Sequence, residues 1–286
     1  MKLPLISVCV PAYNHEQYVV QMLNSVLAQD YPQKELIIIN DGSKDSTARE
    51  IEAWIAVNST KIPVFYQDRE NRGLVRTFND LVQAAHGEYM ALTASDDYLL
   101  PSSLSRRLNY LQSHPEKKAV FGDFQVIDGD GNSVYQSGLT ELHKGRKENF
   151  NDAELLKHEM LHRFCVAGPV LMIERDALSS IGAYDESLMY DDWDMYLRLA
   201  GLGVLGFIDE PVAAYRWHGS NTCRNKVKNL RACQYERKVL ENNRRFFDGE
   251  DLDYINKRIR TRRRKEIEFL IRHGYKNLLR SLGAGG

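Results

Sequence analysis

The sequence is short of the features that mark several common classes of protein. Its 286 residues include only four cysteines, and none of them stands in a Cys-x-x-Cys pair. Two, Cys9 and Cys165, lie in apolar runs where a buried thiol is expected. No apolar run approaches the length of about 18 residues that a membrane span needs, and the apolar start is broken by Pro4 and Pro11 before it reaches signal-peptide length. We therefore expect a cytoplasmic protein with reduced thiols.

Three glycine-rich phosphate-binding loops are also missing. No Gly-x-Gly-x-x-Gly turn follows the first expected strand, which argues against a nicotinamide cofactor. No Gly-x-x-x-x-Gly-Lys-Ser/Thr loop occurs, which argues against an ATPase. The Gly-x-Gly-x-Arg loop of sugar-phosphate nucleotidyltransferases is replaced by Pro11-Ala12-Tyr13-Asn14. The sequence thus disfavours three classes of nucleotide-using enzyme.

The chain does have enough apolar sequence for a large core, and its charge is uneven. Hydrophobic residues make up 43% of it, which suits one large domain with an extension. The net charge is −1, but residues 224–286 carry 18 Lys and Arg against 8 Asp and Glu, which leaves −11 on the preceding residues. We therefore divide the chain into a domain over 1–222, with halves 1–100 and 101–222, and a basic helical extension over 223–286.

Apolar strands and amphipathic helices alternate through the first hundred residues. The expected strands are 5–10, 35–40, 63–67 and 89–94, and the expected helices are 16–28, 46–58 and 74–85. Leu36-Ile37-Ile38-Ile39 is apolar on both faces, as in a buried parallel strand. This order predicts an α/β fold, with a mostly parallel sheet flanked by helices.

The second half of the domain is expected to be more irregular. We expect helices over 101–114, 152–164 and 175–181, strands over 119–126, 133–135, 166–173, 204–208 and 212–215, and an irregular loop over 139–150. A further helix follows Asp191, and its spacing predicts that Met195, Leu199 and Leu202 face inward.

Polar residues that break the apolar periodicity gather where the expected strands end. They are Asn14, Asp41, Arg69, Asn71, Asp96 and Asp97. In an open parallel sheet this edge binds ligands. The adjacent carboxylates of Asp96 and Asp97 offer hard oxygen ligands, which suit Mg²⁺ or Mn²⁺ holding a diphosphate. A pair that merely caps a helix is the other interpretation of these two residues.

Five short motifs, in this order and spacing, resemble the family 2 glycosyltransferases of the GT-A fold, a Rossmann-like fold. They are Val8-Cys9-Val10-Pro11-Ala12-Tyr13-Asn14, Ile39-Asn40-Asp41-Gly42-Ser43, Asn71-Arg72-Gly73 with Asn79, Gly87-Glu88-Tyr89, and Ser95-Asp96-Asp97. The resemblance covers roughly residues 5–220. It implies an inverting hexosyl- or N-acetylhexosaminyltransferase of surface polysaccharide synthesis, with Mn²⁺ or Mg²⁺ as cofactor and a nucleotide sugar, expected to be a UDP sugar, as donor.

The resemblance also implies roles for single residues. Asp97 would coordinate the metal, Asp96 would lie near the ribose or sugar of the donor, and Asp41 would read the base. The remaining donor-nucleotide site would comprise Pro11, Ala12, Tyr13, Asn14, Arg69, Asn71 and Gly73.

A second carboxylate pair, Asp191 and Asp192, comes just before a later helix. At that position the pair would cap the helix and complement its dipole. In the resembling family this segment reads Glu-Asp-x-Asp, and its second carboxylate is the base. That likeness makes Asp192 the base and Asp191 an alternate, since inversion needs a group that takes the acceptor's proton. It also makes His218 a second metal ligand, although a histidine that only supports its loop is equally compatible with the sequence.

Two other motifs suggest different chemistry. His158-Glu159-Met160-Leu161-His162 has the His-Glu-x-x-His pattern of zinc metalloproteases, but no third ligand stands in an extended motif. Asp128-Gly129-Asp130-Gly131-Asn132 resembles a calcium loop without its downstream glutamate, so we expect a turn. A zinc hydrolase stays an alternative, and so does a catalytically silent sugar-nucleotide-binding or scaffold module. In a transferase His158 or His162 would face the acceptor sugar.

The basic extension has three interpretations. Its apolar stripe, which includes Ile255, Ile259 and Ile267, is flanked by the cations of residues 258–265. Such a helix can pack on the catalytic domain, lie on an anionic membrane or bind nucleic acid. Nucleic acid is disfavoured, because aromatic residues do not alternate with the cations. Peripheral contact of residues 250–286 with the inner face of the cytoplasmic membrane would suit a saccharide acceptor that is linked to a lipid.

Overall fold

The computed structural model describes residues 3–188, 190, 192–219, 221 and 230–283, with side chains described as far as residue 272. Contacts between Cα atoms divide the chain into two units, residues 1–186 with 190–218 and residues 187–189 with 219–286. The predicted boundary after residue 222 lies outside the described residues. The division of the domain into halves at residue 100 stays a prediction.

Strand-helix repeats open the first unit, as predicted. They are β1 (Ile6–Ala12), α1 (Val19–Leu27), β2 (Lys34–Asp41), α2 (Thr47–Asn58), β3 (Val64–Arg69), α3 (Leu74–Ala84) and β4 (Tyr89–Leu92). The four strands pair in parallel in the order β3-β2-β1-β4. Their apolar side chains form a continuous core, in which Ile37 and Ile38 are wholly buried. The α/β class is thus confirmed.

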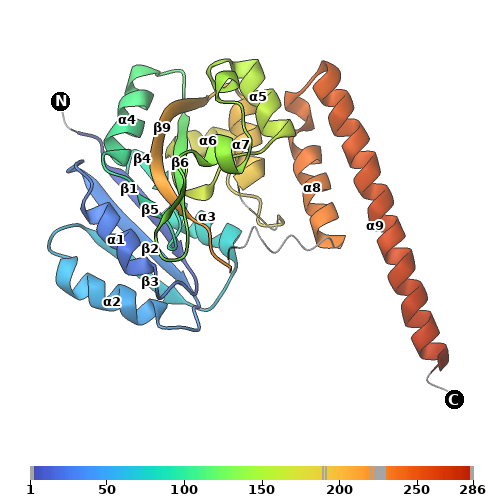
Figure 1. Ribbon diagram of the computed structural model, residues 1–286, viewed down its shortest axis with the longest axis horizontal. Helices are drawn as coiled ribbons and strands as arrows, with labels where there is room; N and C mark the ends of the chain where they lie inside the picture. The colour runs from blue at the N-terminus through green and yellow to red at the C-terminus, as the bar shows by residue number, and fades with distance from the viewer. Residues whose placement is uncertain (1–2, 189, 191, 220, 222–229, 284–286) are drawn as a thin grey trace. The chain divides into compact units, whose positions relative to one another are not determined.

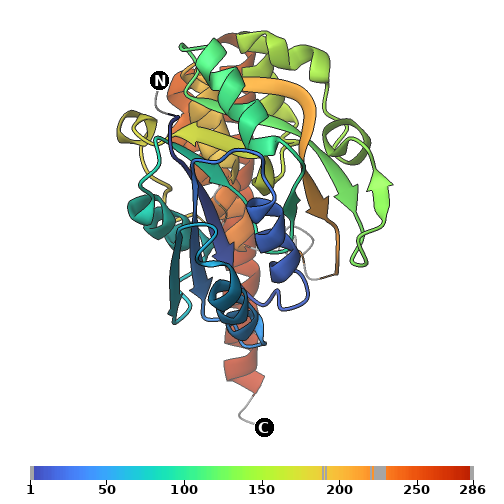
Figure 2. The same ribbon diagram turned by 90° about the vertical axis from the view of Figure 1, so that its left-hand side faces the viewer.

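This strand order reverses the winding of the sheet beside β1. The chain runs outward from β1 to β3 and then crosses back to β4 on the other side of β1. Because such crossovers are right-handed, α1 and α2 cover one face and α3 the other, as Figures 1 and 2 show. The carboxyl ends of β1 and β4 therefore meet at the point where the winding reverses, which is where ligands bind in open α/β sheets.

The second half of this unit extends the sheet with strands of both directions. Its elements are β5 (Tyr98–Leu99), α4 (Ser103–Ser113), β6 (Ala119–Ile127), β7 (Ser133–Tyr135), η1 (Gly138–Leu142), η2 (Lys147–Asn151), α5 (Ala153–His162), η3 (Gly168–Val170), β8 (Leu171–Glu174), α6 (Ala177–Ile181), α7 (Asp192–Gly201) and β9 (Leu205–Arg216). The sheet continues from β4 through β8, β6 and β9 to β5, with β7 paired to β6. Strand β8 is antiparallel to both of its neighbours, so the sheet is mixed.

Four local predictions were wrong. The loop at 139–150 contains two short helices, whose residues Leu139 and Phe150 are buried, and residues 168–170 form a helical turn before β8. The strands expected at 204–208 and 212–215 are one strand, because the register against β6 shifts near Pro211 and accommodates its missing N–H. Leu202 is 46% exposed, since α7 ends at residue 201. Met195 and Leu199 face inward as predicted.

The second unit is a helical pair with its own ion-pair network. It contains α8 (Leu230–Asn243), η5 (Arg244–Phe246) and α9 (Gly249–Gly283), and the two long helices lie side by side in Figures 1 and 2. Arg237 of α8 pairs with Glu266 of α9 at 2.7 Å, and Arg263 of α9 pairs with Glu241 of α8 at 2.7 Å. Among the residues described above, no helix is long and apolar enough to cross a membrane.

Candidate active site

The predicted nucleoside-binding segment follows β1 and meets the loop after β2. Pro11 and Ala12 are the last buried residues of β1, whereas the Tyr13 side chain is 45% exposed. Asn14 has a φ of +55°, and its backbone N–H donates to the hydroxyl of Ser43 at 2.9 Å. A hydrogen bond therefore links the two loops at the carboxyl ends of β1 and β2.

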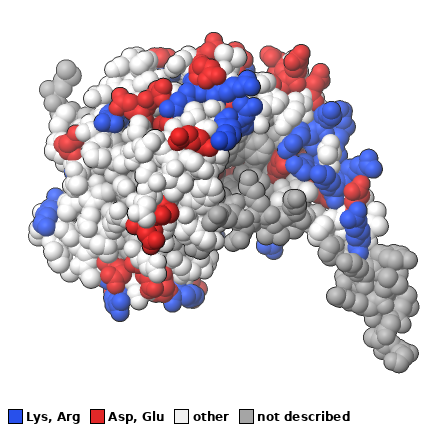
Figure 3. Space-filling model, viewed as in Figure 1, with Lys and Arg blue, Asp and Glu red and all other residues white. Residues whose placement is uncertain are grey.

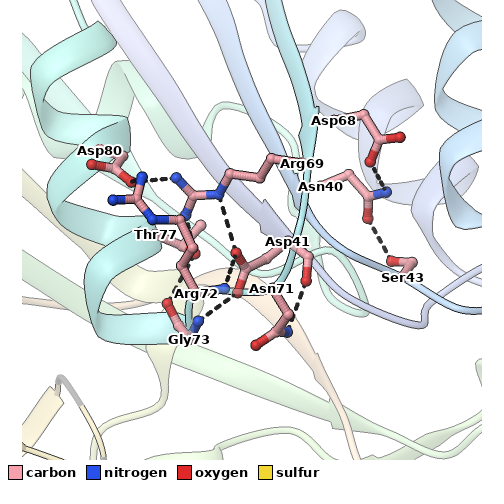
Figure 4. A network of polar contacts seen from close by, with 10 residues as sticks. All are labelled: Asn40, Asp41, Ser43, Asp68, Arg69, Asn71, Arg72, Gly73, Thr77 and Asp80. Atoms are coloured by element: carbon pink, nitrogen blue, oxygen red, sulfur yellow. Dashed lines mark hydrogen bonds and ion pairs between the residues drawn. The ribbon is translucent and has the colours of Figure 1, made fainter.

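Asp41, at the end of β2, organises the segment that follows β3. Its Oδ1 accepts from Nε of Arg69 at 3.1 Å and from the backbone N–H of Arg72 at 2.9 Å, and its Oδ2 accepts from the N–H of Gly73 at 2.8 Å (Figure 4). The Asn71 side chain donates to the carbonyl oxygen of Asp41 at 2.7 Å. The structure thus brings four predicted site residues into one network. Direct contact of Asp41 with a base stays a prediction.

Glycine is needed at two points of this network. Gly42 has a φ of +73°, and a Cβ there would lie 2.6 Å from the backbone nitrogen of Asn71. Gly73, with a φ of +89°, precedes α3 and turns its N–H toward Asp41. A side chain at either position would strain the backbone, and at residue 42 it would also push the two loops apart.

Asp96 forms a cluster with two histidines near the carboxyl ends of β1 and β4. Nε2 of His218, after β9, lies 3.0 Å from Oδ2 of Asp96, and Nε2 of His15, after β1, lies 3.5 Å from the same oxygen. One ligand atom from each of the three side chains lies within 4.8 Å of the other two. Two imidazoles and a carboxylate are a donor set that suits a divalent cation.

The charges in this cluster follow from its burial. Burial raises the pKa of Asp96, but the hydrogen bond to His218 and the charge of His15 outweigh it, so the pKa lies below its ordinary value. Burial lowers the pKa of His15 below its ordinary value, and neighbouring His218 lowers it further, against the opposing effect of Asp96. The cluster therefore favours an ionised Asp96 carboxylate, which is the form of this side chain that ligates metals.

Asp97 has a different environment from its neighbour. It is 3% exposed, and its Oδ1 accepts the backbone N–H of Arg216 at 2.7 Å. Burial raises the pKa of Asp97 well above its ordinary value, and the charges of Asp96 and Asp192 raise it further. The predicted metal pair was Asp97 with His218. In the structure Nε2 of His218 pairs with Oδ2 of Asp96, at 3.0 Å.

Arg216 connects the ends of β4 and β9. Its Nε donates to the carbonyl oxygen of Asp96 at 2.9 Å, and its Nη2 donates to Oε1 of Gln21 at 2.5 Å. The guanidinium carbon lies 4.6 Å from the ring centre of Tyr18. Since Arg216 is only 2% exposed, this buried cation offsets the carboxylates around it.

Asp192 begins α7 and faces the same part of the sheet. It lines a small recess with Phe78, Leu92, Gly168, Leu171, Tyr184, Met195 and Tyr196. Its charge contributes to the raised pKa of buried Asp97, which lies 95 positions earlier in the sequence. Asp194 is no rival base, because it is 2% exposed and pairs with Arg198 at 3.0 Å. Asp191, the alternate base, lies outside the described residues.

The His-Glu-x-x-His segment has a structural use in α5. Its Glu159 is 3% exposed and accepts from the backbone N–H of Arg146 at 3.0 Å and from the side chain of Asn149 at 3.1 Å. The rings of His158 and His162 stack with centroids 4.2 Å apart. The glutamate that a zinc hydrolase would use as its base thus holds the segment around η2.

Two residues of this site were missed from the sequence. His15 directly follows the Pro-Ala-Tyr-Asn motif, and Arg216 stands two positions before His218. Polar residues at the ends of β1 and β9 were the available signal. Neither has a spacing that identifies its partner, because both act across long-range contacts.

Solved structures of other proteins share this architecture. S. aureus TarS, residues 1–349 in complex with UDP-GlcNAc, matches with a TM-score of 0.67 and 18% identity over 89% of this chain and 70% of that one. The mannosyltransferase PcManGT from Pyrobaculum calidifontis, in complex with GDP-Man and Mn²⁺, matches with a TM-score of 0.63 and 17% identity over 99% and 80% of the two chains. The fold is therefore that of GT-A glycosyltransferases.

The amino-acid sequence has relatives as well. An uncharacterized glycosyltransferase of Rickettsia typhi is 29% identical over 79% of this chain and 68% of its own length, and an uncharacterized protein of Mycobacterium tuberculosis is 31% identical over 75% and 61%. Residues 7–182 match the family model described as "Glycosyl transferase family 2". The chain belongs to glycosyl transferase family 2, and its class is glycosyltransferase.

Proposed function

We propose that this glycosyltransferase moves a sugar from a nucleotide sugar, expected to be a UDP sugar, to a hydroxyl of a saccharide or lipid-linked saccharide, with inversion and with Mn²⁺ or Mg²⁺ bound. Donors named for structures with the same fold support the first part, since TarS is seen with UDP-GlcNAc and PcManGT with GDP-Man. The acceptor and its place in surface polysaccharide synthesis rest on the resemblance described from the sequence motifs.

One observation carries the proposal most directly. Asp192 lines a recess with Leu92, the last residue of β4, and the Asp96 cluster follows that strand; the charge of Asp192 also acts on Asp97. Inverting transfer is a single displacement, which needs a base on the acceptor side and positive charge on the leaving-group side of the sugar. The fold supplies candidates for both at one edge of the sheet.

The chain's own residues would divide the work as follows. Asp192 takes the proton of the attacking hydroxyl, and Arg216 holds the backbone of the Asp96–Asp97 turn. The loops organised by Asp41 and Asn14 bind and orient the nucleoside. When bound, the metal supplies positive charge for the departing diphosphate.

For the metal carboxylate we propose Asp96 in place of Asp97. The fit rests on geometry, because His218 Nε2 and His15 Nε2 both approach Oδ2 of Asp96. Oδ1 of Asp97 accepts the backbone N–H of Arg216 at 2.7 Å. In this arrangement Asp97 holds the turn after β4. Asp96 binds the metal, in place of the contact with the donor that the sequence predicted for it.

A membrane-surface role for α9 belongs to the same proposal. Ile267, Leu270 and Ile271 are 57%, 57% and 64% exposed on one stretch of α9. Arg260 and Lys265 precede them in α9 and show no ion pair within the described part of the chain. Lys and Arg gather over α9 on the face drawn in Figure 3. Exposed apolar residues bordered by cations suit an anionic lipid surface, where a lipid-linked acceptor would reside.

The proposal is tested first on the donor. The purified chain is screened for thermal stabilisation by UDP and GDP sugars with Mn²⁺ or Mg²⁺, since a ligand that binds the native state raises the melting temperature. Donors that bind are then incubated with saccharides and lipid-linked saccharides, and the anomeric configuration of the product is read by NMR. Transfer with inversion is expected. If no nucleotide sugar binds, or if configuration is retained, the proposal fails.

A further inference from the structure

His15 makes the Asp96 cluster richer in nitrogen than the sequence motifs imply. Two imidazoles, from the ends of β1 and β9, approach a single carboxylate oxygen at 3.5 and 3.0 Å. Their rings are almost perpendicular, at 89°, with centroids 5.9 Å apart. The two rings therefore approach Asp96 in different planes.

We propose that His15 is a third protein ligand of the metal, with Asp96 and His218, and that this set selects transition ions over Mg²⁺. The inference rests on the proposed function only for the expectation that a metal binds there. Two imidazoles and one carboxylate suit Mn²⁺, Co²⁺ and Zn²⁺, whereas Mg²⁺ prefers oxygen ligands and keeps several waters.

The anchoring of His15 supports a ligand role. Its Nδ1 lies 2.8 Å from the hydroxyl of Ser95, a residue with no exposed surface, and its backbone N–H donates to Oγ1 of Thr47 at 2.8 Å. When Nδ1 carries the proton and donates to Ser95, Nε2 presents its lone pair toward Asp96. Metal-binding histidines are commonly fixed in this way through their second nitrogen.

Tyr18 packs against both imidazoles and completes the support. Its ring centroid lies 5.2 Å from that of His218 and 6.3 Å from that of His15. The Arg216 guanidinium also lies over the Tyr18 ring, 4.6 Å from its centre. The two ligand rings are thus held by one aromatic side chain, which restricts how far either can turn away from Asp96.

A structural cluster without metal makes a different prediction. In that case each histidine donates an Nε2–H to Asp96, and removing His15 costs stability but no metal affinity. The two cases are separated by measuring metal binding itself. Such a measurement also keeps the inference distinct from the proposed function, because it needs neither donor nor acceptor.

The test titrates the full chain with Mn²⁺, Co²⁺ and Mg²⁺, alone and with UDP, by calorimetry and by the visible absorption of Co²⁺. We expect His15→Asn to weaken Mn²⁺ and Co²⁺ binding at least about tenfold, to change the Co²⁺ spectrum and to leave Mg²⁺ binding within about twofold. The matched control is His86→Asn, whose side chain is 74% exposed. Equal Co²⁺ and Mn²⁺ affinities in the His15→Asn variant and the unaltered chain would overturn the inference, as would no transition-ion binding at all.

A second measurement needs no variant. Pulsed electron paramagnetic resonance on the unaltered chain loaded with Mn²⁺ counts the coordinated imidazoles through their nitrogen couplings. Two coupled imidazoles are expected, and one would overturn the inference. If two are found in a protein that transfers no sugar, the proposed function fails while this inference stands. If one coupled imidazole is found in an active transferase, this inference fails while the proposed function stands.

Discussion

The backbone N–H of Arg216 donates to Oδ1 of Asp97 at 2.7 Å, although 119 residues separate the two in the chain. The side chain of Arg216 then reaches the carbonyl oxygen of Asp96, so one residue at the end of β9 fixes the turn that follows β4. That turn carries the candidate metal carboxylate. The geometry of this turn is thus set by β9, a strand that comes much later in the sequence.

Replacing this arginine should loosen the turn. Arg216→Lys keeps the charge but cannot reproduce the bonds to Asp96 and Gln21 from one planar group. We expect a loss of about 2–3 kcal/mol in the free energy of unfolding, measured in urea, because buried hydrogen bonds to a charged group are lost. Arg106→Lys is the control, since its pair with Glu210 is exposed and should contribute less than about 1 kcal/mol. Equal losses in the two variants would contradict this role of Arg216.

Asp192→Asn should separate proton transfer from donor binding. The amide cannot accept the acceptor's proton, so turnover should fall by roughly 10²–10⁴ while the dissociation constant of the donor changes little. Turnover is measured with the donor found in the screen, and donor affinity is measured by calorimetry. Asp176→Asn, whose side chain is 93% exposed, should keep full activity. Unchanged turnover in Asp192→Asn would place the base elsewhere.

Asp41→Asn should weaken nucleotide binding and stability together. The neutral amide replaces a carboxylate that accepts from Arg69 and from two backbone N–H groups, which costs about 1–3 kcal/mol. The affinity for UDP should fall with it, because the segment from Asn71 to Gly73 loses its anchor. Asp80→Asn leaves both backbone bonds in place and should show a smaller effect on each measurement. A larger effect of Asp80→Asn would shift the anchor to that residue.

The thiols of Cys9 and Cys165 should be unreactive in the native protein. Burial, together with nearby Glu159, raises the pKa of Cys165 to about 12, and burial also raises the pKa of Cys9. Since the thiolate is the reactive form, the raised pKa keeps the Cys165 thiol protonated and unreactive at pH 8. Peptide mapping after iodoacetamide treatment at pH 8 should find both residues unlabelled. In urea both should label readily, and rapid labelling of the native chain would disprove their burial.

The exposed stripe of α9 should contribute to membrane binding. Ile267→Ser, Leu270→Ser and Ile271→Ser in one full-length variant should reduce flotation with vesicles of phosphatidylcholine and phosphatidylglycerol at least about tenfold, since each apolar side chain loses its burial in the interface. Val57→Ser alters an apolar side chain of α2 that is 68% exposed, and should leave flotation unchanged. Equal flotation of the triple variant and the unaltered chain would exclude this stripe as the contact.

The sequence by itself determined the repeated strand-helix order, and with it the parallel strands β1 to β4. Apolar periodicity is local, so it can be recognised one element at a time. The same pattern placed Asp41, Asp96 and Asp97 at strand ends, and the motifs around them were specific enough to identify the family. Local pattern was less informative in the second half, where β9 runs unbroken through Pro211 and two short helices occupy the expected loop.

Only the tertiary structure decided which of these side chains meet. In the structure Asp96 contacts His218 and His15, whereas Asp97 accepts the backbone N–H of Arg216. The sequence cannot reveal this difference, because the two aspartates are adjacent in it. The physical reason is that sheet register and crossover handedness bring the ends of β1, β4 and β9 together, whereas spacing along the chain fixes only the elements between them. The cluster of Asp96, His15 and His218 is therefore a product of strand order, because its three members come from loops that are distant in sequence.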